Sequence, residues 1–170
     1  MSAETFTTAM FLITAVIAAG VLVNAVFPVV YNMAGTFSSA SHESDQRMRT
    51  DFKVIATYAS ASGQNGQVWV KNIGSTRIPS ADIMHSDVFT GPQGKFDRFT
   101  YTPDPPAEGG FWTAEWSPGH TSDYWGPGET IKVSFMFYPG VKTPALGEDV
   151  YFQFVLPDGI WRSSEFRAST

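Results

Sequence analysis

The chain has 170 residues, a net charge of −5 and no cysteine, and this length suits one ordinary domain with an appendage. The lack of cysteine excludes disulfide scaffolds, thiolate zinc sites and cysteine nucleophiles, while only 11 Lys and Arg residues argue against nucleic-acid binding. Aromatic residues make up 15% of the chain, with 15 Gly and 11 Pro, which favours a turn-rich β domain over disorder.

Residues 1–35 are predicted to form a membrane-spanning, pilin-like helix. No charged residue or His occurs between Thr5 and Ser41, and residues 9–31 form an almost continuous apolar run. About 20 apolar residues in a helix cross a hydrocarbon core of roughly 30 Å. The run is long for a signal peptide and no Lys or Arg precedes it, so we expect an uncleaved single-pass anchor. The positive charges near the span are too distant to set its orientation.

Small residues halfway along this helix predict helix–helix assembly. Ala15 and Ala19 form a small-xxx-small pair, and Gly20 lies one turn before Asn24. Small side chains let helix backbones approach closely, and a buried Asn amide seeks a partner across such an interface. The alternative is that Ala and Gly are merely common in membrane helices.

The chain beyond residue 35 is predicted to form a polar stalk or linker over residues 36–51 and a β domain over residues 52–170. The helix is expected to end between Gly35 and Thr50. After it, alternating apolar residues and turn signals, including Asn65-Gly66 and residues 91–94 and 157–159, are typical of a β-sandwich or barrel without helices. Eight strands are expected, at residues 52–59, 67–73, 84–90, 95–102, 111–116, 129–138, 149–156 and 159–166.

Catalytic and metal-binding motifs are not found in the sequence. His42, His85 and His120 lack the spacing of a metal site, and no G-x-S-x-G nucleophile elbow occurs. We therefore expect no enzyme activity, no cofactor and no metal.

Aromatic residues crowd residues 95–126, among prolines and glycines. These side chains fill a small sandwich core, or they form a contact surface, since Trp and Tyr dominate protein–protein hot spots. The candidate partner contacts are Trp112, Trp116, Tyr124 and Trp125.

Three short motifs resemble a known family. Residues 68–75 (VWVKNIGS), followed by Ile78-Pro79, are similar to a signature of the archaeal flagellar (archaellum) accessory proteins G and F. Residues 125–131 (WGPGETI) resemble a stretch that opens a later strand in these proteins, and residues 158–166 resemble their closing strand. Asn72, Gly74 and Gly128 are expected to adopt positive φ where strands leave or enter the sheet.

The resemblance implies a stator of the archaellum. It implies an immunoglobulin-like antiparallel β-sandwich outside the cell membrane, a homo-oligomer or filament formed by the chain itself, and contacts with accessory protein F and the S-layer protein. The residues resemble the G type more than the F type. No basic prepilin-peptidase site precedes the apolar run, which departs from archaellins.

Two other functions fit the same pattern. One is a pilin-like subunit of an archaeal surface filament. The other is an extracytoplasmic module that binds protein or sugar through Trp112, Trp116 and Trp125.

Overall fold

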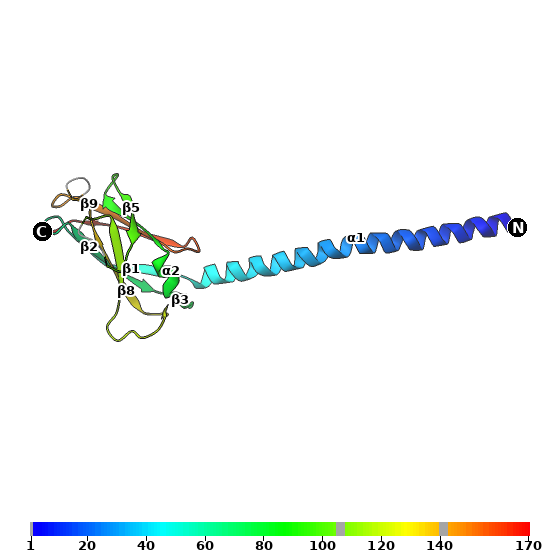
Figure 1. The fold of residues 1–170 in the computed structure, drawn as a ribbon, viewed down its shortest axis with the longest axis horizontal. Helices are drawn as coiled ribbons and strands as arrows, with labels where there is room; N and C mark the ends of the chain where they lie inside the picture. The colour runs from blue at the N-terminus through cyan, green and yellow to red at the C-terminus, as the bar shows by residue number, and fades with distance from the viewer. Residues whose placement is uncertain (1, 105–107, 140–142) are drawn as a thin grey trace. The chain divides into compact units, whose positions relative to one another are not determined.

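A long helix precedes the β domain. The computed structural model describes residues 2–104, 108–139 and 143–170. Helix α1 (Ser2–Arg49) is continuous and has no buried residue (Figure 1). The chain divides into two compact units, Met1–Asp45 and Gln46–Thr170, so the last turn of α1 belongs to the same unit as the strands. The helix ends within the expected range, where the backbone N–H and hydroxyl of Thr50 both donate to the carbonyl of Gln46, at 3.0 and 2.9 Å.

The second unit is built from strands and one short helix. The helix, α2 (Ser80–Met84), corrects the prediction that no helix follows residue 51. The strands are β1 (Phe52–Ser60), β2 (Asn65–Asn72), β3 (Ile78–Pro79), β4 (Asp87–Pro92), β5 (Asp97–Tyr101), β6 (Phe111–Trp116), β7 (Tyr124–Trp125), β8 (Thr130–Met136), β9 (Asp149–Val155) and β10 (Trp161–Arg167).

Eight of these strands form one mostly antiparallel sheet that curls into a sandwich close to a barrel. Their order is β1-β2-β8-β6-β5-β4-β9-β10, and β5 and β6 pair in parallel. The two outer strands approach each other through a bridge between Ser60 and Ser169, and the amide of Ser169 donates to Ala59 at 2.8 Å. Strands β3 and β7 form a separate pair. The predicted antiparallel β-sandwich behind a long helix is therefore confirmed.

Alternation along the strands places the core between the layers. On β2, Val68 and Val70 are buried whereas Trp69 and Lys71 are partly exposed, as expected when successive side chains point to opposite faces. Val68 lies opposite Val133 of β8, so the inward rows of neighbouring strands coincide. The largest fully buried side chains are Trp112, Trp125, Phe52, Phe99, Phe137, Phe152 and Phe154.

Two local predictions are wrong in position. The turn between β1 and β2 lies at residues 61–64, where Gln64 has φ 54°, and Asn65 and Gly66 belong to β2. Residues 84–86, expected in a strand, end α2 and lead into β4. By contrast, antiparallel hairpins do join β4 to β5 and β9 to β10, as predicted, although Gly91 and Pro92 belong to β4 and the first turn therefore begins at Gln93.

Candidate functional site

Helix α1 presents an apolar surface that no other part of the described chain covers. It is the helix, among the described residues, that is long and apolar enough to cross a membrane. Every predicted assembly residue lies on it: Ala15, Ala19, Gly20 and Asn24. A Cβ built on Gly20 meets no atom within 4 Å, so this position has space for a neighbouring helix.

A polar spot interrupts this surface one turn beyond Gly20. Pro28 lies inside α1, and because proline has no N–H, it cannot donate the usual helix hydrogen bond to the carbonyl of Asn24. No hydrogen bond joins the Asn24 side chain to another described residue. The carbonyl and the amide of one residue are thus both available to a neighbouring helix, which is the situation that favours association in an apolar medium.

The VKNIGS motif ends β2 and continues into a loop that holds the end of α1. We call residues 72–76 the attachment loop. The amides of Ile73 and Gly74 donate to the carbonyl of Asp51 at 3.0 and 2.9 Å, and those of Ser75 and Thr76 donate to the carbonyl of Arg49 at 2.9 and 3.3 Å. Backbone groups of the loop therefore satisfy the carbonyl of Arg49, the last residue of α1, which has no partner within the helix, and the carbonyl of Asp51 just after it.

The fully buried Asn72 organises the attachment loop. Its side-chain amide donates to the carbonyls of Thr76 and Trp125, at 2.9 and 3.1 Å, and its side-chain oxygen accepts from the amide of Gly74 at 3.0 Å. One side chain thus ties both ends of the loop to each other and to β7. This explains why a buried strand end carries an Asn.

Gly74 is needed for close approach, and the expected positive φ is wrong for Gly74 and for Asn72. A Cβ at Gly74 would overlap the carbonyl oxygen of Arg49 and lie 2.6 Å from the amide nitrogen of Asp51. The prediction for Gly128 is confirmed, with φ 81°. The sequence pattern did not reveal the partners of this motif, Arg49 and Asp51, because their contact with it spans more than 20 residues.

The four candidate contact aromatics separate into two pairs. Trp112 and Trp125 are fully buried, so in the folded domain they fill the core and are not available to a partner. Trp116 is partly exposed and stacks on His120, with ring centroids 4.2 Å apart and an interplanar angle of 6°. Tyr124 is also partly exposed, and the Arg77 guanidinium lies 4.7 Å from its ring centroid. Only Trp116 and Tyr124 remain candidate contacts.

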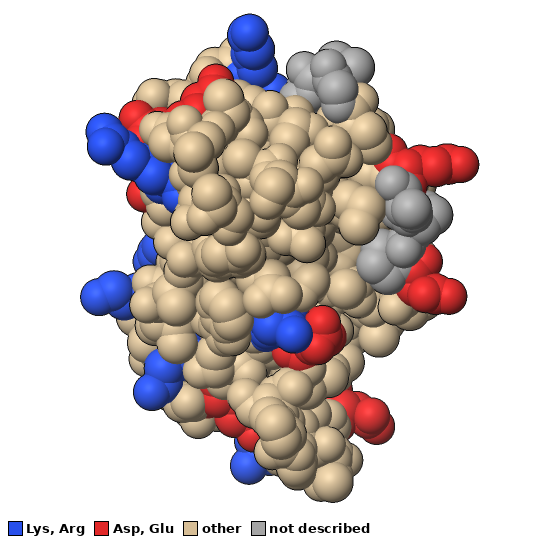
Figure 2. Space-filling model, turned by 90° about the vertical axis from the view of Figure 1, so that its left-hand side faces the viewer, with Lys and Arg blue, Asp and Glu red and all other residues tan. Residues whose placement is uncertain are grey.

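Charge is spread thinly over the β domain. Figure 2 shows one face on which the charged side chains lie mostly around the rim, while the centre is uncharged apart from one adjoining pair of opposite sign. Known ion pairs of the domain include Arg98 with Asp87 at 2.6 Å and Lys132 with Glu115 at 2.8 Å. Contacts made by this face would thus depend on uncharged residues.

Comparison with known sequences agrees with this architecture. The sequence model of the archaeal-type flagellin family matches residues 3–166. A relative from Archaeoglobus fulgidus, named only as an uncharacterized protein, is 28% identical over 169 residues, which cover 98% of this chain and 99% of the relative.

Two solved structures share the fold. The archaellum periplasmic stator protein FlaG from Sulfolobus acidocaldarius superimposes with a TM-score of 0.53 and 22% identity, covering 69% of this chain and 99% of that one. The archaeal flagellum of Methanospirillum hungatei gives a TM-score of 0.54 and 18% identity, covering 92% of this chain and 91% of its own. At these identities the likeness concerns the fold alone.

Proposed function

This chain belongs to the archaeal-type flagellin family, and from that premise we propose that it is a membrane-anchored structural protein of the archaellum that assembles with further copies through α1. The observation that carries the proposal is the surface of α1. A helix with an exposed apolar surface, small residues at Ala15, Ala19 and Gly20, and an unsatisfied Asn24 is stabilised by lipid and by neighbouring helices.

We propose further that the protein acts as an accessory stator of the G type. In this role the β domain lies outside the cytoplasm, contacts an F-type partner and the S-layer, and couples the motor to the cell envelope. The fold shared with a protein named as a periplasmic stator supports this proposal. The attachment loop suits it as well, because it joins the helix end to the β domain through backbone hydrogen bonds.

A filament subunit is the second candidate. It is favoured by one observation, namely that the likeness to the Methanospirillum hungatei flagellum covers 92% of this chain and therefore includes α1 as well as the β domain. In this case α1 would pack against many copies of itself along a filament.

Electron microscopy of the full-length protein, purified from membranes in mild detergent, tests the proposal. The protein is imaged alone and after addition of S-layer protein. Small ordered oligomers that also bind the S-layer protein support a stator, whereas long filaments formed by the protein alone support the second candidate. A protein that stays monomeric both alone and with S-layer protein refutes assembly through α1.

A matched pair of variants locates the assembly surface. Gly20→Leu fills the space where a neighbouring helix would approach, and we expect smaller oligomers with an unchanged β domain. Ala25→Leu adds the same side chain about 140° around the helix and is expected to leave assembly intact. Size-exclusion chromatography with light scattering measures both, and intact oligomers in Gly20→Leu would contradict the proposed interface.

A further inference from the structure

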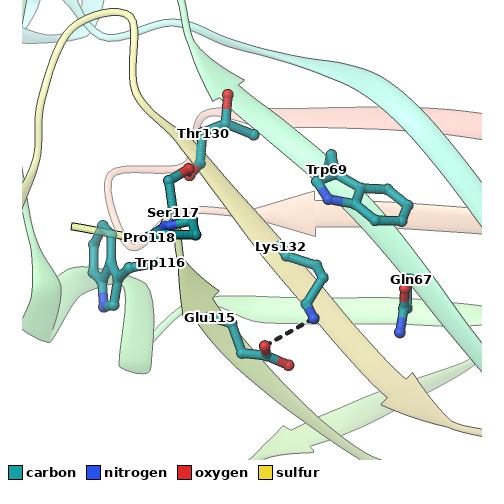
Figure 3. A pocket seen from close by; sticks show the side chains of 8 residues that line it. All are labelled: Gln67, Trp69, Glu115, Trp116, Ser117, Pro118, Thr130 and Lys132. Carbon is teal, nitrogen blue, oxygen red and sulfur yellow. Dashed lines mark hydrogen bonds and ion pairs between the residues drawn. The ribbon is translucent and has the colours of Figure 1, made fainter. Parts of the chain in front are cut away.

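The outward face of β2, β8 and β6 carries two adjoining hollows. The first has a volume of about 360 Å³, and its lining includes Gln67, Trp69, Glu115, Trp116 and Lys132 (Figure 3). The second, of about 430 Å³, also has Gln67 and Glu115 in its lining. We call the two together the tryptophan trough.

The strand register explains how these side chains meet. Trp69 lies opposite Lys132, and Lys132 lies opposite Glu115, so an indole, an ammonium and a carboxylate form one row across the three strands. The next row contains Gln67, Ser134 and Thr113 in the same order. Figure 3 shows Trp69 beside Lys132 and its partner Glu115, with Ser117 and Pro118 between them and Trp116.

We propose that the tryptophan trough binds a neutral oligosaccharide. A sugar ring has an apolar face of C–H groups and an edge of hydroxyls, so it requires a flat aromatic surface beside several groups that donate and accept hydrogen bonds. The trough offers both, with Trp69 beside an amide, hydroxyls and a charged pair. Trp116 also lines it, but its ring is stacked on His120 and packs against the core, so Trp69 supplies the aromatic surface. A few polar groups that converge in an open pocket fix the orientation of a ligand.

The charges of the trough indicate a ligand without net charge. The Lys132 ammonium lies 2.8 Å from Oε2 of Glu115, and the hydroxyl of Ser134 donates to Oε1 of the same carboxylate at 3.3 Å. An anion would have to separate Lys132 from its carboxylate, and a cation would have to displace Lys132. Sugar hydroxyls can bond to both groups while the pair stays intact.

The centre of the trough favours a sugar over a protein partner. Protein hot spots place a fully desolvated apolar or aromatic anchor at the middle of the contact, surrounded by a polar rim. Here the arrangement is reversed, because the middle is the Glu115–Lys132 pair and the indole of Trp69 lies at its side.

The end of the trough formed by β6 is held in place before any ligand arrives. The ring of Trp116 stacks on His120, and the hydroxyl of Ser117, the next residue, donates to the carbonyl of Thr130 at 2.8 Å. A preformed surface loses little freedom on binding.

The test uses the full-length protein in mild detergent on an array of neutral hexose oligosaccharides of two to four units, the same glycans linked to peptides, and sulfated glycans. We expect retention by neutral glycans, with a dissociation constant that rises about tenfold in Trp69→Ala or in Gln67→Ala. Trp161→Ala is the matched control, since Trp161 is half exposed on β10 and lies outside the trough. Near-ultraviolet circular dichroism checks that each variant is folded.

The outcomes distinguish a free polysaccharide from a glycoprotein as the source of the ligand, and they include results that would overturn the proposal. Stronger binding of the free glycans than of the peptide-linked ones supports a free polysaccharide, and binding of the linked form alone supports a glycoprotein. Retention by sulfated glycans only, retention by the peptides without glycan, no retention at all, or equal weakening by Trp161→Ala would overturn the proposal. None of these results bears on assembly through α1, which is measured separately by microscopy.

Discussion

Replacing Asn72 by Ala tests whether the attachment loop depends on one buried side chain. The substitution removes the two hydrogen bonds from the side-chain amide to Thr76 and Trp125 and the one that Gly74 donates to the side-chain oxygen. Because Asn72 is fully buried, the groups left behind cannot easily turn to water. The amide of Gly74 keeps its hydrogen bond to the carbonyl of Asp51 at 2.9 Å. Most of the lost stability therefore comes from the carbonyls of Thr76 and Trp125, which lose their donor.

The expected loss of stability is about 3 kcal/mol, since each buried polar group left without a partner costs about 1–3 kcal/mol. This is a large part of the roughly 5–15 kcal/mol that stabilises an ordinary domain. Asn65→Ala is the matched control, because Asn65 lies at the other end of β2 and is partly exposed. Its side chain makes no hydrogen bond to another described residue, and we expect a loss below about 1 kcal/mol.

Urea unfolding of the full-length protein in detergent, followed by tryptophan fluorescence, measures both variants. With a denaturant slope of about 2 kcal/mol/M, the midpoint of Asn72→Ala should fall by about 1.5 M. Hydrogen exchange at Ser75 and Thr76 should also accelerate, because their amides donate to Arg49 only while the loop keeps its shape. Equal midpoints for Asn72→Ala and Asn65→Ala would refute the reasoning.

Two further substitutions address the same attachment. Gly74→Ala should destabilise the domain by about 2 kcal/mol or more, because the new Cβ overlaps backbone atoms that cannot move aside. The control Ser75→Ala, at an exposed position, should change the urea midpoint little. An unchanged midpoint in Gly74→Ala would mean that the loop can shift. Arg162→Ala breaks the ion pair with Asp51, in which both side chains are about half exposed, and should lower the free energy of unfolding by less than about 1 kcal/mol. A double-mutant cycle with Asp51→Ala that gives a larger coupling energy, independent of salt, would contradict this.

Much of the β domain could be predicted because alternation is a local property. Val68 and Val70 against Trp69 and Lys71 define a strand with one buried face, and the structure shows that face buried. Helix α2 escaped prediction since five residues are too few to show a period of 3.6. The two-residue strands β3 and β7 exist only through their pairing with each other, which no local pattern reveals.

The exposure of individual aromatics was harder to predict for a related reason. Trp112 and Trp116 have the same parity on β6, so alternation assigns them to the same face. They differ because Trp112 lies opposite Phe135 in the middle of the sheet and Trp116 ends its strand and reaches His120. Trp125 is buried on a two-residue strand, where its indole N–H donates to the carbonyl of Glu129 at 2.9 Å.

The attachment loop shows why a short motif can matter more for the transmission of force than an exposed patch. If the protein assembles through α1, any force on the β domain reaches the helix through residues 49–51. Four backbone hydrogen bonds hold the carbonyls of Arg49 and Asp51 there, and their strength depends little on salt, unlike the exposed pair between Asp51 and Arg162. Asn72→Ala should therefore impair the transmission of force by the assembled protein before it impairs assembly. Gly20→Leu should impair assembly first.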